Sequence, residues 1–387
     1  MAKFLVIHPN IDIYGGGERV CHHIMKALVV HGQQVELLAF DFDQNRYSEI
    51  IGEKLPENVT VHTLGNRAVV EAKPPLSVYK RSRNILRLLK KFKKTAEYDY
   101  TFSTQTFSAF EATLLEKAKK NIAYVHFPEI HYDYDHSRKT KKMYLWLYKK
   151  LLEKDIRKID LVFCNSNYTK AITEKYWGRF GIKNPVVAYP PVEKPFWSNK
   201  PLNERAKQVL YVGRFVPQKR HQLMKKLAVD FPRFEFVSAG LLRDSEASWF
   251  EDFSKDLPPN YAVRPNLLEE ELIKLFQDSQ IYCHLMEGEH FGIAPMEALA
   301  SGCITLVHNS GGSGEFIPSE FRWSTFEELK QKIALLVEST DNYTVWNAKK
   351  EELRDRISIL KPQNFEAHIW SNVDALMQQT VKGKSKP

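Results

Sequence analysis

Cysteine is scarce and scattered in this sequence of 387 residues, which holds four cysteines and no Cys-x-x-Cys pair. Cys21, Cys164, Cys283 and Cys303 lie far apart, and all except Cys21 stand in or beside apolar, strand-like runs. That spacing excludes a disulfide framework and argues against a cysteine-bound metal or a redox pair. We therefore expect four reduced cysteines.

Long apolar runs are also missing. No stretch approaches the roughly 20 apolar residues that span a bilayer, and residues 1–9 run into a strand-like segment without a signal-peptide core or cleavage site. We expect a cytoplasmic protein, soluble or peripheral on the cytoplasmic face of a membrane. The net charge of +9 favours anionic partners. Because helix-turn-helix, zinc-finger and RNA-stacking signatures are absent, we expect no nucleic-acid partner.

Strand and helix signals alternate along the whole chain, which predicts an α/β fold with doubly wound parallel sheets. A proline-rich stretch, Tyr189 to Pro195, divides the alternation into two series. We therefore expect two facing Rossmann-like domains, residues 1–190 and 191–362, with a ligand cleft between them, outside the carboxyl ends of the strands. The expected strands are 4–8, 35–40, 59–64, 100–103, 122–126 and 161–165, then 209–212, 234–238, 261–263, 281–286 and 304–308.

Two glutamates in the second series, Glu289 and Glu297, bracket a change from strand to helix. Residues 281–286 have the pattern of a buried strand, and residues 291–300 that of a helix. Unpaired N–H groups at a helix start suit a phosphate, and carboxylates accept hydrogen bonds from sugar hydroxyls. Phosphate donors beside such acids predict a nucleotide-sugar site.

A glycine turn follows the first strand of each series. Gly15-Gly16-Gly17 permits close backbone approach to a ligand at the start of a helix, although a tight turn without a ligand is the alternative. Val20 stands where a dinucleotide fingerprint needs a further glycine, which weakens that interpretation. In the second series, Arg214 and Lys219 flank the equivalent turn and can stabilise a departing diphosphate. Two solvated surface charges are the alternative.

Three further features have a structural and a functional interpretation. His126 ends a strand and can face the cleft, but a lone histidine is more often structural. The loop 309–315 either lies over the cleft or is only a connection. Asp41-Phe42-Asp43 and Asp133-Tyr134-Asp135 match the loose Asp-x-Asp pattern of some metal-dependent transferases, but such short patterns are common, so we assign them no metal.

Two basic segments are predicted to form amphipathic helices. Residues 78–94 carry eight Lys or Arg and no acid, and residues 138–158 carry nine basic residues. In the second segment we expect a packed apolar stripe on one face. Trp146 shares another face with lysines, which suits a lipid headgroup region. Peripheral membrane contact is one interpretation, and packing on the sheet with solvated charges is the other. The expected stripe consists of Tyr144, Leu147, Tyr148 and Leu151.

These motifs together resemble those of the GT-B glycosyltransferases, in the large retaining, GT4-like family that uses nucleotide sugars. The likeness rests on Glu289-x7-Glu297, the Gly213-Arg214…Lys219 turn and the N-terminal glycine loop, and it extends over both domains. Within the family it is strongest to the α-1,2-mannosyltransferases of dolichol-linked N-glycan assembly, which use GDP-mannose. The stretches that carry it are 15–20, 124–128, 165–169, 189–191 and 290–312.

The resemblance implies a metal-independent enzyme without a cofactor, moving mannose from GDP-mannose to a hydroxyl of a lipid-linked oligosaccharide or another glycan. It further implies an acceptor-side domain, 1–190, onto which helix 363–387 packs back, and a nucleotide-sugar domain, 191–362. The implied roles are a diphosphate grip by Arg214 and Lys219, ribose binding by Glu297, catalytic contact by Glu289 and His126, and donor contacts at Gly16, Gly17, Phe291 and Gly292.

The residues alone leave other activities open. A UDP- or ADP-sugar could be the donor, and the same fold serves nucleotide-sugar epimerases and sugar phosphorylases. A basic protein that only binds anionic lipid is a further alternative. An epimerase would form product from the donor alone, whereas a phosphorylase would need inorganic phosphate instead of the nucleotide.

Overall fold

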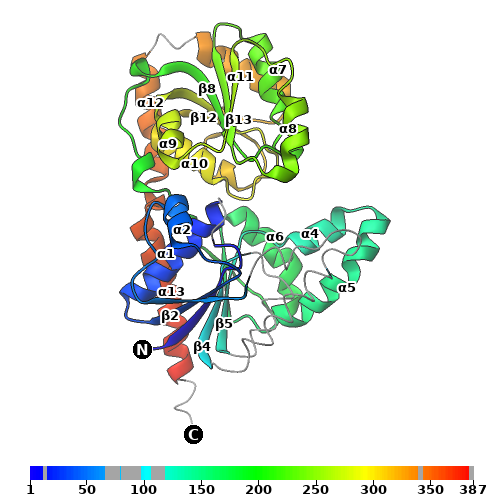
Figure 1. The fold of residues 1–387 in the computed structure, drawn as a ribbon, viewed down its shortest axis with the longest axis vertical. Coiled ribbons are helices and arrows are strands. Elements are labelled where there is room, and N and C mark those ends of the chain that lie inside the picture. Colours follow the sequence, from blue (N-terminus) through cyan, green and yellow to red (C-terminus); the bar gives the residue numbers. More distant parts are fainter. Residues whose placement is uncertain (12–14, 66–78, 80–96, 106–117, 339–342, 383–387) are drawn as a thin grey trace. The chain divides into compact units, whose positions relative to one another are not determined.

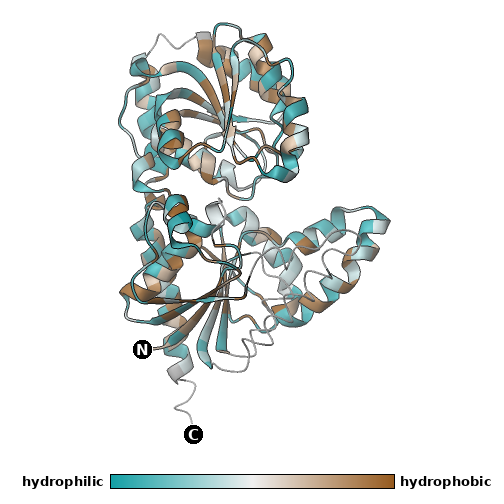
Figure 2. Cartoon of the chain, in the orientation of Figure 1, coloured by the Kyte–Doolittle hydropathy of each residue, from teal (hydrophilic) through white to brown (hydrophobic). Residues whose placement is uncertain are grey.

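A computed structural model describes residues 1–11, 15–65, 79, 97–105, 118–338 and 343–382. The chain forms two compact units (Figure 1): unit 1 is Met1–Pro190 with Gln363–Pro387, and unit 2 is Pro191–Pro362. Each unit is a parallel sheet with helices packed against it, so the predicted α/β fold with two Rossmann-like sheets is confirmed. The helices carry both hydrophobic and hydrophilic residues, as amphipathic helices do (Figure 2).

The sheet of unit 1 has seven strands within the described residues, in the order β3-β2-β1-β4-β5-β6-β7, and its neighbours are parallel. In β1 (Lys3–Ile7), the last four residues are apolar and have no exposed surface. Such a run is typical of a parallel strand that is covered on both faces. The other strands are β2 (Gln34–Ala39), β3 (Val59–Thr63), β4 (Tyr98–Ser103), β5 (Ala118–Val125), β6 (Leu161–Cys164) and β7 (Val186–Val187).

The C-terminal helix α13 (Pro362–Lys382) completes the core of unit 1. Phe365, Ile369 and Val373 recur every four residues, are buried, and join the core that α1 and the sheet form. Beside them, Glu366 Oε1 lies 2.7 Å from His23 Nδ1. The other helices are α1 (Gly16–Val30), α2 (Gln44–Ile51), α4 (Glu129–His136), α5 (Lys139–Ile156) and α6 (Asn167–Trp177).

Helix α5 buries a different stripe from the predicted one. Its buried positions are Leu145, Tyr148, Leu152, Glu153 and Ile156, so of the four predicted stripe residues only Tyr148 is buried. Glu153 can lie on the inner face because Lys149 and Arg179 both pair with it at 2.6 Å. The buried apolar residues recur at spacings of three and four, so the packed face is turned by about one residue from the predicted stripe. The other basic segment, 78–94, lies outside the described residues except for Tyr79.

The sheet of unit 2 has six strands within the described residues, in the order β10-β9-β8-β11-β12-β13, with parallel neighbours. The strands are β8 (Ala206–Val212), β9 (Glu235–Gly240), β10 (Tyr261–Pro265), β11 (Ser279–Cys283), β12 (Ile304–His308) and β13 (Arg322–Trp323). The helices are α7 (Gln222–Asp230), α8 (Ala247–Phe253), α9 (Glu269–Asp278), α10 (Ile293–Ser301), α11 (Phe326–Glu338) and α12 (Tyr343–Arg356). Of the helices in the described ranges, none combines the length and apolar character needed to cross a membrane.

Candidate active site

Lys219 and Glu289 belong to separate sequence motifs but meet in unit 2. Lys219 ends a short 3-10 turn (Pro217–Lys219) after β8, and Glu289 lies in the turn after β11. The two strands are parallel neighbours, so their carboxyl ends share one edge of the sheet. Lys219 Nζ lies 3.0 Å from Glu289 Oε2, and His284 Nε2 lies 3.1 Å from the same oxygen. A cation, a carboxylate and an imidazole thus form one cluster.

The electrostatics of this cluster keep Glu289 ionised. Burial works to raise the pKa of Glu289, but Lys219 and His284 lower it well below its usual value. Burial lowers the pKa of His284, so its ring stays largely neutral. A diphosphate that binds Lys219 must compete with Glu289 for the ammonium group. The Glu289 oxygens can then accept hydrogen bonds from a sugar hydroxyl.

Glycines fix the backbone around Glu289. Gly311 has a φ of 85°, and a Cβ there would lie 2.2 Å from the Glu289 carbonyl oxygen. The N–H of Gly312 donates to that same oxygen at 2.7 Å. Gly292, with a φ of 86°, lies on the other side, where a Cβ would lie 3.2 Å from Glu289 Cγ. The loop 309–315 therefore contacts the site directly through the backbone of Glu289.

Helix α10 begins directly after Glu289. Its N-cap is Gly292, and among the described residues no side chain caps its first N–H groups. Phe291 is buried and packs edge to face on Phe316, with ring centroids 6.2 Å apart. Glu297 is buried one turn into the helix. Main-chain donors at a helix start beside a lysine suit a phosphate group.

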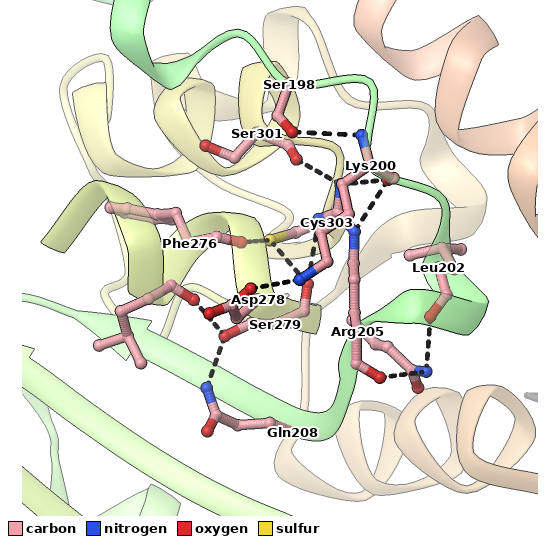
Figure 3. Close-up of polar contacts among 12 residues, drawn as sticks. Ser198, Lys200, Leu202, Arg205, Gln208, Phe276, Asp278, Ser279, Ser301 and Cys303 are labelled. Atoms are coloured by element: carbon pink, nitrogen blue, oxygen red, sulfur yellow. Dashed lines mark hydrogen bonds and ion pairs between the residues drawn. The ribbon is translucent and has the colours of Figure 1, made fainter. Parts of the chain in front are cut away.

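Arg205 fixes the opposite end of α10 (Figure 3). Its guanidinium donates to the carbonyl of Ser301 at 2.6 Å and to that of Ser279 at 3.2 Å. These carbonyls lie at the C-terminal ends of α10 and α9, where a cation is favoured by the helix dipole. Arg205 also donates to the Lys200 carbonyl at 2.7 Å, and it is only 5% exposed. No sequence motif indicates this residue, because it lies in a polar connecting segment.

The backbone of the turn that carries Arg214 is held tightly. Gly240 ends β9 with a φ of 153°, and a Cβ there would lie 1.9 Å from the Gly213 carbonyl oxygen. The N–H of Gly213 donates to Ala239 at 2.9 Å, and the Arg214 carbonyl accepts from His221 Nε2 at 3.0 Å. The Arg214 residue itself is exposed. The exposed Arg214 therefore follows the carboxyl end of β8, as Lys219 does.

In unit 1, the structure brings together Gly17 and His126. Gly16 and Gly17 are the first residues of α1, and a Cβ on Gly17 would lie 3.4 Å from His126 Nε2. His126 follows β5, and its Nε2–H donates to the Thr104 carbonyl at 3.2 Å, because a carbonyl can only accept. Of the predicted residues, Gly17 thus lies beside His126 in unit 1, and Lys219 and Gly292 lie beside Glu289 in unit 2.

The two Asp-x-Asp segments have partners of other kinds. Asp43 caps α2 by accepting from the N–H groups of Asn45 and Arg46 at 2.8 and 3.0 Å. Asp133 pairs with Lys141 at 2.7 Å. Within the described ranges, His, Cys, Asp and Glu form no group of three or more that could hold a metal ion.

Residues that the motifs did not indicate also shape the site, namely Thr104, Gly240 and His284 beside the clusters and Arg205 at the far end of α10. Thr104 and His284 each follow a strand directly, so a search for polar residues at strand ends would have found them. Gly311 belongs to the predicted loop 309–315, but its close approach to Glu289, like that of Gly240 to Gly213, is recognisable only once the facing backbone is known.

Two family models together match most of the chain. The model for glycosyltransferase family 4 matches residues 14–193, and the model for glycosyl transferases group 1 matches residues 193–353.

Similar proteins carry a consistent name. The chain is 23% identical to the GDP-Man:Man(3)GlcNAc(2)-PP-Dol alpha-1,2-mannosyltransferase of Dictyostelium discoideum, over 98% of this chain and 85% of that protein. It is 27% identical to the human protein of the same name, over 57% of this chain and 49% of the relative. Among solved structures, Anabaena HepE in complex with UDP-glucose has a TM-score of 0.70 at 13% identity, covering 97% of this chain and all of that one. The chain is a glycosyltransferase of the GT-B fold and belongs to the GT4-like family.

Proposed function

We propose that this enzyme transfers an α-mannosyl group from GDP-mannose, with retention of configuration, to a hydroxyl of a lipid-linked oligosaccharide. The observation that carries the proposal is the contact between Lys219 and Glu289 at the start of α10. It brings a residue that can bind a diphosphate and a residue that can bind a sugar together at one edge of the sheet. The names of the relatives support mannose as the sugar and a dolichol-linked glycan as the acceptor.

The residues act in the roles that the family resemblance implies. Lys219, Arg214 and the N–H groups at the start of α10 stabilise the charge that develops on the departing diphosphate, without a metal. Glu289 accepts hydrogen bonds from the sugar, and Glu297 binds the ribose. As the bond from the sugar carbon to the diphosphate breaks, the acceptor oxygen bonds to that carbon and its proton passes to the diphosphate. His126 lies at the reacting face, with Gly16 and Gly17 beside it.

A thermal-shift screen tests the donor. The purified protein is heated with GDP, UDP, ADP and their common sugar conjugates, with and without EDTA, because a ligand that binds the folded state raises the melting temperature. We expect a selective shift with GDP-mannose that survives EDTA. A shift with UDP-glucose, the ligand in the Anabaena structure, would mean that UDP-glucose and not GDP-mannose is the donor, and the class of reaction would stay the same. Loss of the shift in EDTA would contradict metal independence.

We also propose that α5 makes peripheral contact with an anionic membrane surface. Met143, Trp146, Leu147 and Leu151 lie on one face of the helix at spacings of three and four and are 79%, 53%, 48% and 42% exposed. Lys139, Lys150 and Lys154 are exposed around them. Apolar side chains amid lysines match a headgroup region, and cytoplasmic leaflets are anionic.

Vesicle sedimentation tests this surface. Trp146→Ser combined with Leu147→Ser is expected to weaken binding to vesicles with about one third anionic lipid by roughly tenfold, because two exposed apolar side chains are removed. Val229→Ser is the matched control, since Val229 is 66% exposed on unit 2. Equal binding by the double variant and the control would show that α5 does not contact the membrane.

A further inference from the structure

Unit 1 contains a buried imidazole nitrogen that has no hydrogen-bond partner among the described residues. His8 follows β1 and is 1% exposed, and this nitrogen is its Nε2. The other nitrogen, Nδ1, lies 2.9 Å from Thr104 Oγ1. The Thr104 hydroxyl donates to the Ile7 carbonyl at 3.3 Å, so its oxygen accepts from His8 Nδ1–H. The hydrogen bond from Nδ1 to Thr104 therefore orients the His8 ring, and Nε2 can hydrogen-bond to another group.

Glu18 faces this nitrogen. Glu18 Oε1 lies 3.8 Å from His8 Nε2, and the Glu18 residue is 7% exposed. Its other carboxylate oxygen lies against Gly15, where a Cβ would be 2.6 Å away. A separation of 3.8 Å is too long for a direct hydrogen bond, but one oxygen atom at about 2.8 Å from each group can bridge them. The geometry thus fits a shared hydroxyl.

The pair lies next to the residues already placed in the site. A Cβ on Gly17 would lie 3.9 Å from His8 Cε1 and 3.4 Å from His126 Nε2, so this glycine lies against both rings. Thr104 joins the two histidines, because its side chain binds His8 and its carbonyl binds His126. All five residues lie at the carboxyl ends of β1, β4 and β5 or in the first turn of α1.

We propose that His8 and Glu18 form a hydroxyl-binding subsite for the acceptor saccharide, an inference that rests on the proposed transferase function. A hydroxyl accepts from His8 Nε2–H and donates to Glu18 Oε1. A second anion would be repelled by the carboxylate, and an apolar group would leave both polar atoms unpaired. Burial lowers the pKa of His8, but Cys21 and Glu18 raise it, and the net direction is upward, consistent with an Nε2–H donor.

Direct binding of an α-linked mannotriose, measured by calorimetry or ligand-observed NMR without any nucleotide, tests this subsite. Glu18→Gln removes only a charge, and His8→Asn retains a donor near the Nδ1 position while removing Nε2. We expect each to weaken mannotriose binding about tenfold, the effect of losing one hydrogen bond to a charged group. The apparent affinity for GDP-mannose, measured by thermal shift, should change less than twofold.

His22→Asn is the matched control, because His22 lies on the same helix and is also 1% exposed but binds Tyr47 and Glu53. It should leave mannotriose binding unchanged. The subsite would be overturned if Glu18→Gln binds mannotriose with wild-type affinity, or if the wild type does not bind mannotriose. If His8→Asn does not fold, Glu18→Gln alone decides. If the wild type binds mannotriose but transfers nothing from GDP-mannose, the proposed function fails while the subsite stands.

Discussion

The two units use the same part of the same fold for different kinds of polar cluster. Both place side chains at the carboxyl ends of parallel strands, beside the start of a helix that opens with glycine. Unit 2 holds a fixed cation, Lys219, against the partly buried carboxylate Glu289. Unit 1 holds the titratable ring of His8 near Glu18, with a gap that fits an oxygen. A permanent charge suits a diphosphate, whereas an imidazole–carboxylate pair suits hydroxyls.

Removing Lys219 should produce the largest effect on binding, and it tests the role proposed for unit 2. Lys219→Met leaves the diphosphate without its ammonium partner and leaves Glu289 without its cation, with only the hydrogen bond from His284, so donor affinity should fall by about 100-fold or more. Titration of GDP-mannose, followed by calorimetry, measures this. Mannotriose binding should be unaffected, because its proposed residues lie in unit 1.

The control for Lys219 is Lys207→Met, which removes an exposed lysine from β8 of the same unit. Donor affinity that changes equally in both variants would mean that general charge, rather than the position of Lys219, attracts the nucleotide. Donor affinity unchanged by Lys219→Met would remove the diphosphate assignment.

Glycine substitutions sharpen the comparison, because the space for an added Cβ differs between Gly240 of unit 2 and Gly17 of unit 1. Gly240→Ala places a Cβ 1.9 Å from the Gly213 carbonyl oxygen at a φ of 153°, so the backbone must move. We expect a loss of about 3 kcal/mol or more in stability, measured as the free energy of unfolding in urea. Gly178→Ala is the control, since nothing lies within 4 Å of its Cβ position.

Gly17→Ala tests the same point in unit 1. Its Cβ would meet His126 Nε2 at 3.4 Å, an ordinary contact, and alanine favours a helix more than glycine does. Stability should change by less than about 1 kcal/mol. Transfer should nevertheless fall by roughly tenfold, because the methyl group occupies space beside His126. Full activity would mean that no ligand approaches this turn.

The sequence predicted the fold and the principal motifs but not the contacts that connect them. Alternating strand and helix patterns are local, so the order of elements was readable, and the glycine turns and the two glutamates stood out by type and spacing. The contact of Lys219 with Glu289 joins residues 70 positions apart, and it depends on β8 and β11 being neighbours. Long-range pairings of this kind leave no trace in one sequence.

The error at α5 has a different cause. The predicted stripe assumed that only apolar residues face the core, whereas Lys149 and Arg179 allow Glu153 to lie there. Two leucines that were assigned to the core therefore lie on the surface. Apolar residues occupy two neighbouring faces of α5, so hydrophobic periodicity alone does not decide which face is buried.

Acid should weaken both units through buried histidines, which provides the most general test. Burial, with His23 as the next cause, lowers the pKa of His22 to about 4, and burial likewise lowers the pKa values of His131 and His221 to about 4. Between pH 6.5 and 4 the unfolded chain binds these protons and the folded chain does not. The contribution of these three rings to stability is therefore complete above about pH 6.5 and falls as the pH drops, by at most about 3 kcal/mol for each ring.

Variants that remove one ring from each unit show whether the units titrate independently. His131→Asn keeps an acceptor for Trp177 Nε1, and His221→Gln keeps a donor for the Arg214 carbonyl. Each also removes a buried ring that packs on aromatic side chains, so the slope of stability against pH, rather than the stability itself, is compared. In calorimetric melts between pH 7 and 4.5, we expect His131→Asn to reduce the acid sensitivity of the unit 1 transition alone and His221→Gln that of unit 2 alone. If either variant alters both transitions equally, the units unfold as one, and the contrast between their sites is then a difference within a single cooperative structure.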